Sequence, residues 1–198
     1  MPRTLEVRHF HERTTVRRTV TAGAALALLV ATSCGAESAT PRPIPARALP
    51  GNASDAVALD VQAVATDAIE FTELETLLTD AGFTGGSQRL FSTVTGGRRR
   101  MLARVLEFET PAGAERYVGW LSDHVEEVIG EAEVDAELDV PAGTTVFVHE
   151  PDPCCHNDTR IFLAVWTKGD RAVTLEFGGQ AARASAVTEL VTRLDAAV

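Results

Sequence analysis

Three segments of the chain carry apolar residues at the three- and four-residue spacing of an amphipathic helix. The first follows the capping-box sequence "TELE", which begins at Thr72, and it ends at Gly82. The second follows Thr110–Pro111, a cap and a first-turn proline, and it ends at Gly130. The third covers roughly residues 181–196. The predicted buried residues are Leu74, Leu77, Leu78 and Ala81 in the first helix, Ala114, Tyr117, Val118, Leu121, Val125 and Val128 in the second, and Val187, Leu190, Val191 and Leu194 in the third.

Strand-like segments lie between these helices. Residues 89–109, "RLFSTVTGGRRRMLARVLEFE", predict a hairpin that turns at Gly96–Gly97. Residues 144–150 predict a further strand, and residues 160–177 predict two more, joined at Lys168–Gly169–Asp170.

Residues 131–140 alternate acidic and apolar side chains without a break. A period of two predicts an edge strand with one solvated and one buried face. A calcium-binding loop is the alternative, but an EF-hand loop needs a central glycine, and this segment has none. We therefore predict a strand.

Two stretches of the chain echo each other at an offset of 69 residues. "LEF" begins at Leu106 and again at Leu175, and an amphipathic helix follows each copy. A glycine-turned hairpin precedes each copy as well, which suggests two ββα units. The pattern predicts an α+β domain, with an antiparallel sheet of five or six strands and its helices on one face.

The N-terminal segment is typical of a targeting signal. Residues 1–33 carry five arginines and two glutamates, and then an apolar stretch from Val20 to Ala31. This stretch is too short to span a bilayer, since a spanning helix needs about 20 residues. Small residues lead directly into Cys34, in the order Ala31-Thr32-Ser33-Cys34. A secreted protein without a lipid is the alternative interpretation.

The "ATSC" sequence resembles the lipobox of bacterial membrane lipoproteins, although Ala31 stands where that family most often has leucine. The resemblance implies that Cys34 becomes a lipidated N-terminus at the outer face of the plasma membrane, and it covers only about the first 35 residues. Residues 34–54 contain several prolines and few large apolar residues, which predicts a flexible tether. Residues 55–198 then form one globular domain.

Charge narrows the choice of partners. The totals of 18 basic and 28 acidic residues include five arginines and two glutamates before Cys34, so residues 34–198 carry 13 and 26, a net charge of −13. Such a surface repels phosphate backbones, so nucleic acid is excluded as a partner. The expected partners are the membrane, through the lipid, and a small ligand or an envelope protein.

The segment "EPDPCCHNDT" (Glu150–Thr159) is predicted to be a loop between two strands, and of all segments it looks least like a purely structural one. Its adjacent Cys154 and Cys155 are expected to oxidise outside the cytoplasm, which favours a vicinal disulfide. A metal site that includes His156 is a second interpretation, but adjacent cysteines do not have the usual spacing of zinc ligands. Intermolecular disulfides or free thiols are the third.

No nucleophile motif, phosphate-binding loop or metalloprotease motif occurs in the sequence. We therefore predict a non-enzymatic, extracytoplasmic binding domain of sensor type, without a cofactor. A ligand is expected between the sheet and its helices or under the loop that carries Cys154 and Cys155. The alternatives are a metal- or redox-active module that uses Cys154, Cys155 and His156, and a structural component of the envelope.

Overall fold

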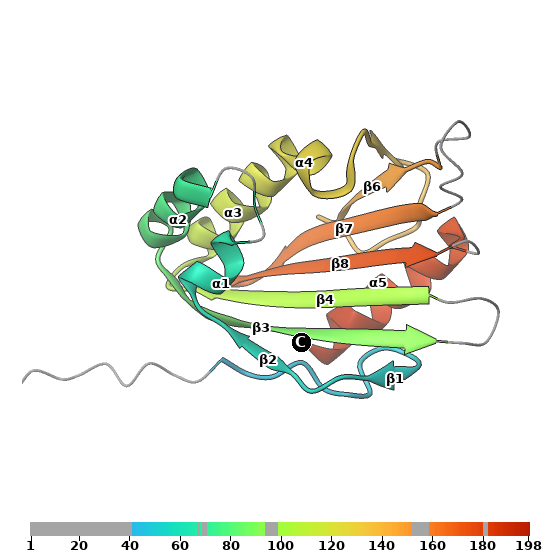
Figure 1. Ribbon diagram of the computed structural model, residues 1–198, viewed down its shortest axis with the longest axis horizontal. Helices are drawn as coiled ribbons and strands as arrows, with labels where there is room; N and C mark the ends of the chain where they lie inside the picture. Colours follow the sequence, from blue (N-terminus) through green and yellow to red (C-terminus); the bar gives the residue numbers. More distant parts are fainter. Residues whose placement is uncertain (1–40, 67, 69–70, 94–98, 152–158, 180–181) are drawn as a thin grey trace, which may run out of the picture. The chain divides into compact units, whose positions relative to one another are not determined.

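One antiparallel sheet forms the centre of the computed structural model (Figure 1). The structure describes residues 41–66, 68, 71–93, 99–151, 159–179 and 182–198. In these residues the strands are β1 (Asn52–Ala53), β2 (Val57–Leu59), β3 (Phe83–Thr93), β4 (Arg99–Phe108), β5 (Glu133–Val134), β6 (Thr145–His149), β7 (Arg160–Lys168) and β8 (Arg171–Gly179). The helices are α1 (Val61–Ala65), α2 (Phe71–Asp80), α3 (Pro111–Asp123), α4 (Val125–Ile129) and α5 (Ala184–Ala197).

The strand order is β1-β3-β4-β8-β7-β6-β5, and β2 also pairs with β3. The α+β class and the antiparallel sheet are therefore confirmed, but the eight strands among the described residues exceed the five or six predicted. The β7–β8 hairpin turns where predicted, since Lys168 pairs with Arg171 and Gly169 takes a φ of 62° that favours glycine. Strands β3 and β4 pair as the predicted hairpin. Their turn at Gly96–Gly97 lies outside the described residues.

Both faces of the sheet are covered by helices. On β4, Met101 and Val105 pack in one core with α5, whereas Leu106 and Phe108 pack in a second core with α1–α4. The prediction that the helices gather on one face is wrong for this reason. The central strands carry apolar residues on both sides, so each side needs its own cover. In Figure 1 the helices α1–α4 lie on the viewer's side of the sheet and α5 lies behind it.

Residues 41–54 form part of the domain. Ile44 is 1% exposed and Leu49 2% exposed, and both pack in the same core as α5. Strand β1 then pairs with β3. The prediction that the tether extends to residue 54 is therefore wrong over this segment. A few apolar residues with specific contacts outweigh a composition that is otherwise typical of a spacer.

The two ββα units keep their order but are not related by a rotation. Strands β4 and β8 are antiparallel neighbours, and the leucine and phenylalanine of each "LEF" face the helix that follows. Because α3 and α5 lie on opposite faces, superposing β8 on β4 and α5 on α3 places β7 on the side of β4 opposite to β3. The sequence echo therefore reflects a shared local pattern, and no symmetric duplication of structure.

The helix boundaries follow local signals in most places. Thr110 Oγ1 accepts a hydrogen bond from the Gly113 amide at 3.2 Å, and Pro111 begins α3, as predicted. The four predicted buried residues of α5 are all buried. In α2, however, Thr72 lies inside the helix, one residue after its start, and is not its cap. Gly82 ends this segment with a φ of 72°.

The predicted second helix divides at His124 into α3 and α4, and Val128 is 45% exposed, not buried. The predicted strand over residues 131–140 shrinks to the two residues of β5. Asp135 ends it, because its Oδ1 accepts a hydrogen bond from the Glu137 amide at 3.2 Å and so favours a turn. Val134 is 58% exposed, so the alternation does not bury one face.

None of the helices in the described part of the chain combines the length and the apolar character that crossing a bilayer requires.

Candidate functional site

Among the described elements, α1–α4 lie over one end of their face of the sheet, the end of β4 at Phe108. No described helix lies on the viewer's side of the other end, at the right of Figure 1. The side chains on the central part of this face follow from the strand register. Arg104 stands opposite Thr174, Leu102 opposite Glu176, and Glu176 in turn opposite Leu163. Polar groups therefore lie at the centre of the sheet, flanked by leucines.

An inner pocket of about 60 Å³ lies between this central part and the helices. Its walls are mainly apolar and aromatic, and its polar residues come chiefly from the sheet. We define the inner pocket by its lining residues Val64, Ala68, Leu74, Leu102, Arg104, Tyr117, Trp120, Leu121, Glu127, Val128, Leu163, Thr174 and Glu176. A single water needs only about 10–15 Å³ of such volume, so the inner pocket has room for a small organic group.

A larger outer cleft of about 480 Å³ lies over the end of the face that has no helix. Its lining residues are Leu90, Arg100, Leu102, Thr159, Ile161, Glu176, Gly178 and Gly179. Leu102 and Glu176 line both cavities, so the inner pocket and the outer cleft adjoin along one face. The outer cleft has the size of small-molecule sites, which run from about 300 to 1,000 Å³.

Three polar side chains in these cavities are available to a ligand. Thr174 is only 5% exposed, yet within the described residues its hydroxyl makes no hydrogen bond. The half-buried Glu176 carboxylate and the exposed Arg100 guanidinium also lack a side-chain partner there. Arg104 differs, because its Nε donates to Gln88 Oε1 at 3.1 Å. Buried polar groups are nearly always hydrogen-bonded, so an unpaired Thr174 and Glu176 in a cavity indicate a binding surface.

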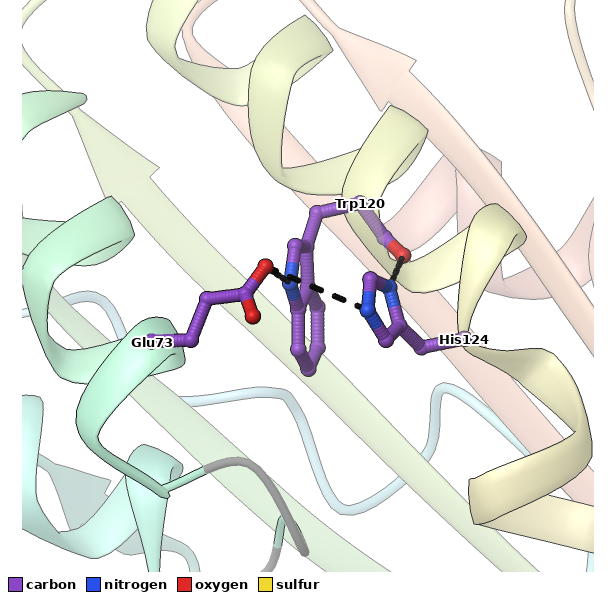
Figure 2. Close-up of polar contacts among 3 residues, drawn as sticks. All are labelled: Glu73, Trp120 and His124. Carbon is purple, nitrogen blue, oxygen red and sulfur yellow. Dashed lines mark hydrogen bonds and ion pairs between the residues drawn. The ribbon is translucent and has the colours of Figure 1, made fainter.

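Trp120 forms one wall of the inner pocket, and a polar contact with α2 fixes it there. Its indole Nε1 donates to Glu73 Oε1 at 3.1 Å, and this bond joins α3 to α2 (Figure 2). The indole is 9% exposed. The rotamer of a pocket-lining tryptophan is thereby set before any ligand arrives.

His124, at the junction of α3 and α4, holds the other side of the same indole. Its ring stacks on Trp120 with the centroids 4.3 Å apart and the planes at 18°. His124 Nδ1 lies 2.8 Å from the Trp120 carbonyl oxygen, which can only accept, so Nδ1 carries the proton. Nε2 lies 3.9 Å from Glu73 Oε1. Figure 2 shows the indole between Glu73 and the imidazole of His124.

The described residues on either side of the cysteine-containing segment include Glu150, Thr159, Arg160 and Ile161. Arg160 closes the base of this segment, since its Nε and Nη2 both donate to Glu150 Oε2, at 2.9 and 2.6 Å. Thr159 and Ile161, at the start of β7, line the outer cleft. The expected ligand position between the sheet and its helices corresponds to the inner pocket, whereas the alternative position under the Cys154–Cys155 loop lies outside the described residues.

The predicted special residues themselves lie outside the described residues. These are Cys34, the lipidation site, and Cys154, Cys155 and His156, the candidates for a disulfide or a metal site. In the part of the chain that the structure does describe, no three histidine, cysteine, aspartate or glutamate side chains come together as metal ligands.

Trp166 and His149 carry side chains that often serve binding or catalysis, but here their contacts are structural. Trp166 is 2% exposed, and its Nε1 donates to Asp195 Oδ1 at 3.1 Å in the core with α5. His149 Nδ1 lies 2.8 Å from the Glu131 carbonyl oxygen at the end of β6. These contacts tie structural elements together and open onto neither the inner pocket nor the outer cleft.

Four residues of the site escaped the sequence analysis: Leu102, Arg104, Thr174 and Glu176. They occupy alternate positions of two predicted strands, where a polar residue is usually read as solvent-facing. The available signal was the alternation itself: in β4 and β8 polar residues stand between apolar ones. Both strands lie in the middle of the sheet, where a polar residue does not simply face solvent.

The fold and the site define an α+β domain with a cleft on one face of its sheet. No protein-family model matches the chain, and no curated protein matches it. The fold is similar to the crystal structure of the extracellular domain of PknH from Mycobacterium tuberculosis, with a TM-score of 0.51. The sequences are 12% identical, over 74% of this chain and 84% of that chain. At this identity the likeness concerns the fold alone.

Proposed function

We propose that this protein is a lipid-anchored extracytoplasmic binding protein, and that its domain holds a small ligand in the inner pocket and outer cleft without catalysing a reaction. One observation carries this proposal. Thr174 and Glu176, adjacent on one face of β8, have no side-chain partner among the described residues and line cavities of about 60 and 480 Å³. A ligand supplies the missing partners.

The surroundings of the two residues support this role. The Thr174 hydroxyl is not one of the fully enclosed unpaired side-chain atoms of the described residues, so it stays accessible from the cavity. A fold that only needed a stable core would place an apolar residue at position 176, between Leu102 and Leu163, and another at position 174, between Arg104 and Val165. A few polar groups within a largely apolar cavity are typical of binding sites, where they orient the ligand.

The location outside the cytoplasm rests on two independent supports. The fold is similar to an extracellular domain, and the sequence carries an apolar signal segment that ends at Cys34. Lipidation at Cys34 holds the protein at the outer face of the plasma membrane in this proposal. Two or more acyl chains suffice for a stable anchor, because each buried CH₂ contributes about 0.8 kcal/mol.

A fragment titration of the full-length protein tests the binding role. A panel of small organic molecules of mixed charge is titrated while backbone amide chemical shifts are followed. Molecules that bind are expected to shift the amides of Leu102, Thr174 and Glu176. Leu102→Trp fills the junction of the two cavities and should abolish these shifts, whereas Val134→Trp, on the exposed β5, should not. Shifts that persist in Leu102→Trp, or that map elsewhere, contradict the proposal.

Fractionation of cells tests the anchor. The unchanged protein is expected in the membrane pellet and to incorporate labelled palmitate, and Cys34→Ser is expected to lose both properties. Cys154→Ser is the matched control, since it removes a different thiol. A Cys34→Ser protein that stays labelled and pelleted rules out the proposed anchor and leaves the binding role to the titration.

A further inference from the structure

The chemistry of the inner pocket points to the class of its ligand. Glu176 is half-buried and is the charged residue that lines both cavities. Its cross-strand neighbours on this face are Leu102 on β4 and Leu163 on β7, and neither offers it a hydrogen bond. Arg104, the next residue after Leu102 on the same face of β4, donates from its Nε to Gln88 Oε1 on β3, away from β8. Among the described residues no side chain forms an ion pair with the Glu176 carboxylate, although Arg104 lines the same pocket.

We propose that the ligand is an organic cation with an apolar substituent, whose ammonium group binds Glu176 and Thr174. This inference rests on the proposed binding function and adds the chemical class. An ammonium group donates hydrogen bonds and carries the charge that Glu176 lacks. The buried Thr174 hydroxyl accepts a further hydrogen bond from the same group, since it stands next on the same face of β8.

The walls of the inner pocket suit the apolar part of such a ligand. Leu74, Leu121 and Leu163 line it together with the aromatic rings of Tyr117 and Trp120. Aromatic rings attract cations as well as apolar groups, and the interaction strengthens in a partly desolvated site. Glu127, at the exposed rim, adds a second carboxylate.

The charge of the whole domain acts in the same direction. Residues 34–198 carry a net charge of −13, and a cleft in a strongly charged protein concentrates ions of the opposite sign. The opposing features are Arg100 in the outer cleft and Arg104 in the inner pocket. Arg100 is exposed, and salt and water screen exposed charges far more than half-buried ones. The Nε of Arg104 is bound to Gln88 Oε1 on β3. Glu176 therefore determines the sign of the preferred ligand.

A matched set of probes tests the class on the full-length protein. n-Butylammonium, n-butanol and butyrate share an alkyl chain and differ in charge, and each is titrated while amide chemical shifts are followed. We expect n-butylammonium to bind at least about tenfold more tightly than butyrate, with shifts at Thr174 and Glu176, and to weaken as salt is raised.

Glu176→Gln keeps the shape of the side chain and removes its charge. It is expected to reduce n-butylammonium affinity about tenfold and to leave n-butanol unchanged. Thr174→Val, a second isosteric variant, should reduce affinity severalfold. Glu189→Gln is the matched control, because Glu189 is an exposed carboxylate on α5, on the other face of the sheet.

The outcomes separate the class from the function. Butyrate that binds as tightly as n-butylammonium, or a Glu176→Gln protein with unchanged affinity, overturns the cationic class. If such binding is still lost in Leu102→Trp, the proposed binding site stands. If no probe shifts the amides that line either cavity, and the mixed panel does not either, both proposals fail.

Discussion

The indole Nε1 of Trp120 lies 3.1 Å from Glu73 Oε1, and this hydrogen bond joins α3 to α2 at the wall of the inner pocket. The opposite face of the sheet holds a matching pair, since Trp166 Nε1 donates to Asp195 Oδ1 at the same distance. One tryptophan lines a cavity and the other is buried in a filled core. The same bond thus serves a site in one case and packing alone in the other.

A double-mutant cycle measures the coupling between Trp120 and Glu73. Trp120→Phe and Glu73→Ala are each expected to destabilise the protein, and their combined effect should fall short of the sum by about 1–2 kcal/mol, the range for a hydrogen bond to a charged group. Urea unfolding provides the free energies. A strictly additive result would show that the bond contributes nothing.

The contrast with the other pair separates the site from stability. Trp166→Phe should also destabilise the protein while leaving the amide shifts caused by n-butylammonium unchanged. Trp120→Phe should alter these shifts, because the indole lines the inner pocket. Equal effects of the two variants on binding contradict a specific role for Trp120.

Residues 41–54 should be necessary for a stable domain. Leu49→Ala in the full-length chain is expected to lower the free energy of unfolding by about 2–5 kcal/mol, the range for removing a buried leucine. Val57→Ala is the control, because Val57 is 52% exposed and should change stability by less than about 0.5 kcal/mol. A chain that begins at residue 55 should fail to unfold cooperatively. Wild-type stability in this shortened chain contradicts the observed packing of Ile44 and Leu49.

Two glycines of α3 make opposite predictions for the same substitution. A Cβ at Gly113 would lie 2.1 Å from the Ala81 carbonyl oxygen, so Gly113→Ala must push α3 away from the end of α2. We expect a loss of more than about 2 kcal/mol in the free energy of unfolding. A Cβ at Gly119 meets nothing within 4 Å, so Gly119→Ala should stabilise the helix by about 0.5–1 kcal/mol. Thermal unfolding decides both, and a neutral Gly113→Ala is the result that sinks this account of the α2–α3 contact.

The vicinal disulfide of Cys154 and Cys155 stays a prediction from the sequence. The intact mass of protein purified from an oxidising compartment is expected to be about two hydrogens below the reduced value, and both thiols should resist alkylation until a reductant is added. A native mass that exceeds the chain by one metal ion, lost on unfolding, favours the metal-binding alternative with His156 instead.

The sequence by itself determined the elements whose signals are local. The stripe of Val187, Leu190, Val191 and Leu194 predicted α5, Thr110–Pro111 predicted the start of α3, and Lys168–Gly169–Asp170 predicted the β7–β8 turn. Each of these depends on backbone geometry and on contacts within a few residues. Such interactions can be read in a short window of sequence, because the same residues supply both the signal and the structure.

Only the tertiary structure decided which surfaces meet. The sequence did not indicate that α5 covers the face opposite α3. It also did not indicate that Ile44 and Leu49, which lie more than 40 residues before β4 in the chain, complete the core with α5. Nor did it single out Thr174 or Glu176, which line the inner pocket, Glu176 lining the outer cleft as well. These outcomes depend on apolar burial summed over distant segments. No single stretch of the chain contains that sum, and so the binding site became visible only in the fold.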